Sequence, residues 1–175
     1  MATQAQGRLG DILAPGLRVV FCGLNPAATA AASGHNFSAP SNRFWTVLHL
    51  SGFTPHRIAA VDERAILQFG CGLTALVSRP TAQASEVSRA EFAGAGEAFT
   101  RKIERYAPRA VAFLGKAGYA AMRRQKSVAW GRQDETIGGA IAWVLPNPSG
   151  LNRAFRLDDL VRDYGALRLA LDAEP

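Results

Sequence analysis

Two asparagine-proline pairs are the residues of this chain whose type and position could support chemistry. Asn25-Pro26 and Asn147-Pro148 each follow a short apolar run. A side-chain amide can hydrogen-bond a water molecule or a polar ligand, although it cannot accept a full proton. A site built on Asn25 and Asn147 would therefore act by positioning its reactants, with little in it to serve as a strong base.

Four segments have the composition of β-strands, and two of them lead into these pairs. The segments are residues 18–24 (RVVFCGL), 73–77 (LTALV), 110–114 (AVAFL) and 141–145 (IAWVL). The first and the last stop at an asparagine-proline pair, which disfavours helix. Ligands of open α/β sheets bind outside the carboxyl ends of the strands, so both asparagines are expected at the ligand-binding edge.

Helical patterns separate these strands. Expected helices begin at Ser41, Asp62 and Ser88 and occupy residues 116–124 and 157–171. Strands that alternate with helices imply a largely parallel sheet covered on both faces. We predict an α/β fold, a three-layer α/β/α sandwich with a central, mainly parallel sheet of about four strands.

The length and composition set the remaining limits. With 175 residues, we expect a single domain over residues 11–175 and a flexible tail over residues 1–10, which lack the apolar core of a signal peptide. No apolar stretch approaches the roughly 20 residues of a membrane-spanning helix. Cys22 and Cys71 lie in apolar or glycine-rich stretches, and the histidines lack metal-ligand spacing. We expect buried free thiols, no metal and a reducing cytoplasm.

The charge balance is compatible with a polyanionic partner. Twenty Lys and Arg against fourteen Asp and Glu give a net charge of +6, which alone is weak support for nucleic-acid binding. The cluster of Arg123, Arg124 and Lys126 is typical of a solvated helix end. Arg153 and Arg156 flank a glycine-containing loop beside the second asparagine-proline pair, and for them we favour a functional role.

The loop over residues 25–43 is long for a connection, and long ordered loops tend to be functional. It contains Phe37, which could stack on a flat ligand or anchor the loop to the core; the residues alone favour the core contact. Gly115-Lys116 lacks the upstream glycine and the following hydroxyl of a phosphate-binding loop. A nucleotide-hydrolysing enzyme is therefore a remote alternative.

The two pairs and their neighbours resemble a known family. Residues 23–26 (GLNP) and 145–153 (LPNPSGLNR) are similar to the two signature loops of the mismatch-specific uracil/thymine-DNA glycosylase family, within the uracil-DNA glycosylase superfamily. The resemblance extends over nearly the whole chain from Asp11. Its other segments are residues 11–18 (DILAPGLR), 42–45 (NRFW), 51–54 (SGFT), 79–81 (RPT) and 86–88 (EVS).

This resemblance implies a monofunctional DNA repair enzyme made of one glycosylase domain. Such an enzyme flips uracil, with thymine or etheno-cytosine as further candidates, out of mismatched duplex DNA. It hydrolyses the N-glycosidic bond without metal or cofactor and leaves an abasic site. The implied partner is double-stranded DNA with G:U or related mispairs, bound by a monomer in the cytoplasm at the nucleoid.

The resemblance also assigns roles to individual residues. Asn25 matches the residue that positions the attacking water. Leu24, Phe37 and Asn147 match the base pocket, where stacking of the base on Phe37 displaces the earlier interpretation of this ring. Asn147 stands where distant members carry histidine, which implies slow turnover. The DNA wedge is matched by Gly150, Leu151, Asn152 and Arg153.

Several points stay open at this stage. Ala27, Ala30 and Ala75 stand where relatives often have glycine or polar residues, so the choice among uracil, thymine and etheno-modified bases is unsettled, as are single-strand activity and oligomeric state. Glu86 and Asp62 could assist catalysis, although a structural or solvated role is favoured for both. The alternative function is a non-catalytic module that recognises mismatched or damaged DNA.

Overall fold

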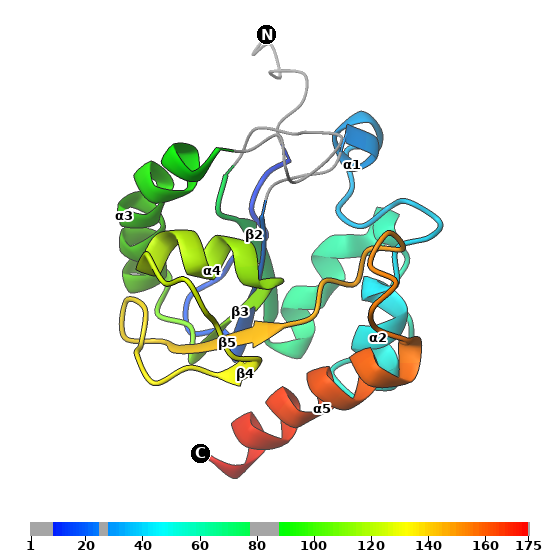
Figure 1. Cartoon of the computed structure of the whole chain (residues 1–175). Coiled ribbons are helices and arrows are strands. Elements are labelled where there is room, and N and C mark those ends of the chain that lie inside the picture. The colour runs from blue at the N-terminus through cyan, green and yellow to red at the C-terminus, as the bar shows by residue number, and fades with distance from the viewer. Residues whose placement is uncertain (1–8, 25–27, 78–87, 175) are drawn as a thin grey trace, which may run out of the picture.

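The computed structural model describes residues 9–24, 28–77 and 88–174 (Figure 1). Four predictions fall wholly or mainly on the other residues: the N-terminal tail, Asn25, Ala27 and Glu86. They lie outside the described part of the chain and stay predictions.

A five-stranded sheet forms the centre of the molecule, in the order β2-β1-β3-β5-β4. The strands are β1 (Val19–Gly23), β2 (Cys71–Ala75), β3 (Ala110–Leu114), β4 (Gly131–Arg132) and β5 (Ile141–Leu145). Strands β2, β1, β3 and β5 run parallel to one another, and β4 pairs antiparallel with β5 at the edge of the sheet. The mainly parallel α/β sheet is thus confirmed, with one short edge strand more than expected.

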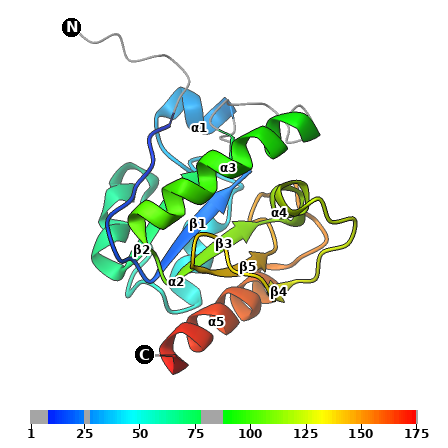
Figure 2. The same cartoon turned by 90° about the vertical axis from the view of Figure 1, so that its left-hand side faces the viewer.

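Helices cover both faces of the sheet and complete the three layers (Figures 1 and 2). They are α1 (Ala28–Ser33), α2 (Phe44–Leu50), the 3₁₀ helix η1 (Ala60–Phe69), α3 (Arg89–Tyr106), α4 (Lys116–Arg123) and α5 (Leu157–Ala173). Core residues of α2, η1 and α5 pack on one face, and those of α3 and α4 pack on the other.

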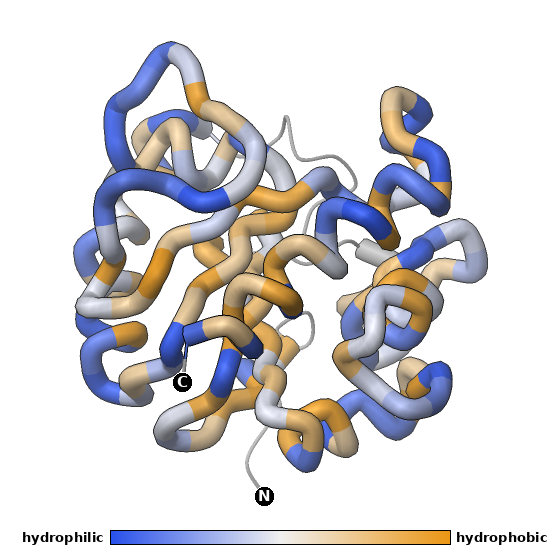
Figure 3. Tube along the Cα trace, turned by 90° about the horizontal axis from the view of Figure 1, so that it is seen from below, coloured by the Kyte–Doolittle hydropathy of each residue, from blue (hydrophilic) through white to orange (hydrophobic). Residues whose placement is uncertain are grey.

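The alternation of side chains along β3 shows why both faces are covered. Ala110 and Ala112 belong to the core under α2 and α5, whereas Val111 and Phe113 belong to the core under α3 and α4. All five residues of the strand are buried, which explains its uninterrupted apolar run. Figure 3 accordingly shows apolar segments in the middle of the view.

Two helix starts differ from the prediction. Ser41 does not cap α2; the helix begins at Phe44, whose N–H donates to the Asn42 Oδ1 at 2.9 Å. The short helix begins at Ala60, and Asp62 interrupts it with φ −101° and ψ 21°. In contrast, the expected cap of α3 is confirmed, because the Oγ of Ser88 accepts the Glu91 N–H at 3.1 Å.

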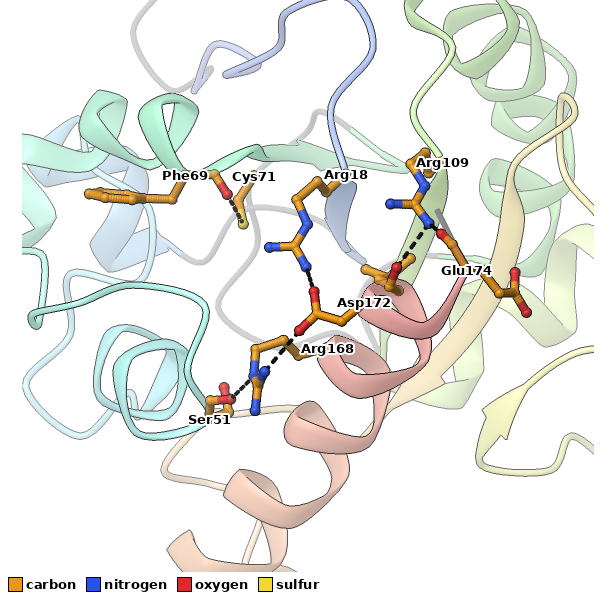
Figure 4. Close-up of polar contacts among 9 residues, drawn as sticks. Arg18, Ser51, Phe69, Cys71, Arg109, Arg168, Asp172 and Glu174 are labelled. Carbon is orange, nitrogen blue, oxygen red and sulfur yellow. Dashed lines mark hydrogen bonds and ion pairs between the residues drawn. The ribbon is translucent and has the colours of Figure 1, made fainter.

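A charged network fastens the end of α5 to the amino ends of the strands (Figure 4). The Asp172 carboxylate pairs with Arg18, just before β1, and with Arg168 at 3.0 Å. The Arg168 Nε donates to the Ser51 carbonyl at 2.7 Å, at the end of α2. Before β3, Arg109 donates to the Leu171 carbonyl at 2.9 Å. This network lies at the edge of the sheet opposite the carboxyl ends of β1, β3 and β5.

We expect Asp172→Ala to lower the free energy of unfolding by about 1 kcal/mol or less, since half-exposed ion pairs contribute little. The loss should shrink in high salt, which screens the pairs in the folded protein. Urea unfolding at low and high salt measures both effects, with Asp134→Ala, another exposed carboxylate, as control. A larger, salt-independent loss would show that the network acts through packing instead.

Candidate active site

Three parallel strands end at the edge of the sheet where the candidate residues lie. The N–H of Gly115, directly after β3, donates to the Leu145 carbonyl at the end of β5 at 2.7 Å. A Cβ placed on Gly115 would lie 3.8 Å from the Cβ of Asn147, and one on Gly118 would lie 3.0 Å from the Cδ2 of Leu24. Leu24 and Asn147 therefore lie on either side of the start of α4.

The turn after β5 is held together by its own polar groups. The Asn147 Oδ1 accepts the Ser149 N–H, and the Asn147 carbonyl accepts the Asn152 Nδ2, both at 2.9 Å. The Leu151 N–H donates to the Ser149 Oγ at 3.2 Å. One lone pair of its oxygen is engaged, so the Asn147 side chain offers a ligand its N–H donors and the second lone pair of the oxygen.

The four expected wedge residues have different surroundings in this turn. A Cβ on Gly150 would lie 2.6 Å from the Cβ of Ser41, so only glycine allows this approach. Ser41, which does not cap α2, thus packs against this turn. Leu151 is 83% exposed, an unusual state for a leucine. Asn152 braces the turn through its side chain, and Arg153 is exposed.

Arg43, directly before α2, clamps this turn. Its guanidinium donates to three carbonyls of the turn, those of Pro148 at 3.3 Å, Ser149 at 2.9 Å and Asn152 at 3.0 Å, and to the Phe155 carbonyl just after it at 2.7 Å. The backbone N–H of Arg43 also donates to the Pro148 carbonyl, at 3.0 Å. In Figure 1 the orange segment after β5 accordingly lies beside the pale-blue segment that precedes α2. Sequence reasoning gave Arg43 no role, although it lies in the NRFW segment.

Phe37 makes the core contact that its residue type suggested. Its ring is half-buried and stacks on Phe44, with centroids 4.2 Å apart and planes at 28°. The backbone of Phe37 is left-handed, with φ 54°. One face of the ring is thus packed against α2, and a flipped base would have to use the remaining exposed part.

A cation lies at the same edge of the sheet. Lys116, the first residue of α4, places its Nζ 4.4 Å from the ring centroid of Trp130. The Trp130 ring is 42% exposed and meets Phe155 edge-on at 5.2 Å. Lys116 thus adds positive charge next to the clamped turn.

Three buried ionisable groups of the described chain are held neutral. Burial raises the pKa of the Tyr164 hydroxyl, which donates to the Pro146 carbonyl at 2.9 Å, at the start of the turn. Burial also raises the pKa of the Cys22 thiol, and that of Cys71 to about 12, so neither thiol is an activated nucleophile. The described residues contain no group of three or more His, Cys, Asp or Glu suited to hold a metal ion.

The comparison with known proteins decides the family. A model described as "Uracil DNA glycosylase superfamily" matches residues 11–166. The chain belongs to this superfamily. A solution NMR structure of a candidate uracil DNA glycosylase from Methanosarcina acetivorans shares the fold, with a TM-score of 0.64 and 19% identity over 95% of this chain and 98% of that one.

Membership of the uracil-DNA glycosylase superfamily supports a DNA glycosylase function in DNA repair, and DNA as the partner. The predicted resemblance is confirmed at this level. Among the described residues no helix is long and apolar enough to cross a membrane. Of the two carboxylates considered for catalysis, Asp62 is exposed on η1 and Glu86 lies outside the described residues.

Proposed function

We propose that this superfamily member is a monofunctional, mismatch-specific uracil-DNA glycosylase. The observation that carries the proposal is the shared edge: Leu24, at the end of β1, and the clamped turn from Asn147 to Arg153 lie at the same side of the sheet. Asn25 directly follows Leu24 in the chain. The enzyme acts as a monomer, because a wedge on one chain is enough to open a duplex. Its proposed location is the cytoplasm.

The proposed reaction is a hydrolysis. Asn25 orients a water molecule towards C1′ of the flipped nucleotide, whose sugar passes through an oxocarbenium-like state. The C1′–N bond breaks with its electron pair going to the base, and the water oxygen bonds to C1′. The proton that the water loses passes through solvent to the base anion. The Asn147 amide can donate a hydrogen bond to a base carbonyl that gains negative charge. The products are an abasic site and free base.

The base itself is held by stacking and by an apolar surface. Phe37 stacks on the flipped base, and backbone groups near Leu24 hydrogen-bond its edge. Two alanines stand where relatives often carry polar groups: Ala30, which is buried, and Ala75, the last residue of β2. Discrimination therefore rests largely on how readily the base leaves its pair, and a mispaired uracil leaves at least cost.

Leu151→Ala tests the wedge. We expect single-turnover release of uracil from a G:U duplex to fall about tenfold. Extrusion of the base costs a few kcal/mol, and the exposed leucine offsets part of this cost by filling the space that the base leaves in the stack. Release from single-stranded DNA should change far less. Leu169→Ala, an exposed leucine near the end of α5, is the matched control. Equal losses on both substrates would remove the wedge role from Leu151.

The proposed function is tested by one substrate panel. G:U, A:U, G:T, G:etheno-cytosine and single-stranded uracil substrates are compared at one salt concentration, with abasic sites detected by strand cleavage in alkali. We expect the fastest release from G:U. Tight binding of G:U duplex without any product would instead favour the alternative, a recognition module that does not break the glycosidic bond.

A further inference from the structure

The backbone of Phe37 is in a conformation that needs support from its surroundings. Its φ of 54° lies in the left-handed region, which residues with a side chain rarely adopt. Such conformations persist where neighbouring contacts fix the chain, and they cluster at ligand sites. The contacts on either side of Phe37 therefore decide where its ring lies.

On the N-terminal side, these contacts converge on Asn36. Its N–H and its Nδ2 both donate to the Glu63 Oε2, at 2.7 and 3.2 Å. Its carbonyl accepts the Trp45 Nε1–H at 3.1 Å. Every polar function of Asn36 except its side-chain oxygen thus has a partner among the described residues. One oxygen of Glu63, the Oε2, accepts from both the backbone N–H and the Nδ2 of Asn36.

On the C-terminal side, a hydrogen bond between two serine side chains holds the chain. The Oγ of Ser38 lies 2.7 Å from the Oγ of Ser33, at the end of α1. The ring of Phe37 between these two anchors rests on Phe44. Hydrogen bonds thus hold the residues on both sides of Phe37.

The environment of Glu63 favours this role over a purely solvated one. The side chain is only 12% exposed, and a carboxylate in such a position requires hydrogen bonds to offset lost hydration. Its second oxygen lies 3.7 Å from the Nδ1 of His35, a buried atom with no hydrogen-bond partner among the described residues. The carboxylate therefore faces the segment from His35 to Asn36 with both oxygens.

We propose that Glu63 is a positioning residue: through Asn36 it holds the Phe37 ring where the flipped uracil stacks. This inference rests on the proposed function and adds a residue on η1, outside both signature loops, to the specificity pocket. Glu63 does not touch the base. It acts by fixing the left-handed backbone that aims the ring.

A double-mutant cycle tests the proposal. Glu63→Ala should slow single-turnover release of uracil from a G:U duplex about tenfold, since stacking of a base on an aromatic ring is worth about that factor or more. Phe37→Ala should do the same, and the double variant should match Phe37→Ala alone. Additive losses would mean that Glu63 acts independently of Phe37, which overturns the proposal.

Two further variants separate positioning from general stability. Glu63→Gln keeps an acceptor oxygen for the Asn36 N–H and should stay within about threefold of the unmodified enzyme. Asp134→Asn alters an exposed carboxylate outside η1 and should have no effect. A loss in Glu63→Gln as large as in Glu63→Ala would count against a hydrogen-bonding role.

A spectroscopic readout keeps this test independent of activity. The indole N–H signal of Trp45 should shift in Glu63→Ala, because its acceptor is Asn36, whereas the signals of Trp130 and Trp143 should not. An unshifted Trp45 signal would contradict the proposal even with active enzyme. If the intact protein releases no uracil, the proposed function fails, and the Trp45 and Phe37 ring signals still report whether Glu63 holds the loop.

Discussion

Asn25→Ala should reduce single-turnover release of uracil from a G:U duplex by about 100-fold or more, because displacing a reactant by about 1 Å slows a reaction by about this factor. Affinity for the duplex should change little, since the wedge and the basic residues that surround it remain. Rapid-quench kinetics measures the first quantity. Fluorescence anisotropy with a non-hydrolysable uracil analogue measures the second.

Asn25→Asp is the informative companion. A carboxylate of the same size can still hold water and, unlike the amide, can accept its proton, so this variant should be faster than Asn25→Ala. An Asn25→Ala enzyme with undiminished release would show that another group positions the water. Parallel loss of binding and release in Asn25→Ala would assign Asn25 to DNA binding instead of chemistry.

The strands and the edge of the sheet could be predicted because their causes are local. A strand covered on both faces must be apolar throughout, and Ala110–Leu114 meets this requirement residue by residue. Residues Leu24 and Asn147 follow such strands, so their position at one edge follows from parallel topology alone. The two-residue strand β4 is too short to carry any periodic pattern.

The residues that hold the candidate site could not be predicted because their partners are distant in sequence. Arg43 binds carbonyls 105 to 112 residues away, and Glu63 binds Asn36 across 27 residues. The sequence does not distinguish a charged side chain that faces solvent from one that binds a distant backbone carbonyl. Ser41 is a good cap by type, yet the close approach of Gly150 gives it a different neighbour.

Arg43→Ala should lower both stability and activity. The four carbonyls that accept from its guanidinium lose a charged donor at once, so we expect the free energy of unfolding to fall by about 3 kcal/mol and the Tm by about 10 °C. The turn that carries Leu151 then loses its fixed position. Release of uracil from a G:U duplex should fall about tenfold or more at temperatures where the variant is folded.

The control for Arg43 must lose stability without touching the site. Arg109→Ala meets this need, because Arg109 also donates to backbone carbonyls, those of Leu171 and Glu174, but at the opposite edge of the sheet. Calorimetry ranks the two variants, and single-turnover kinetics well below both transitions compares their activity. Arg43→Lys should fall between Arg43→Ala and the unmodified enzyme, since one ammonium cannot reach four carbonyls. If Arg43→Ala and Arg109→Ala release uracil equally fast, the clamp stabilises the fold and contributes nothing to the wedge.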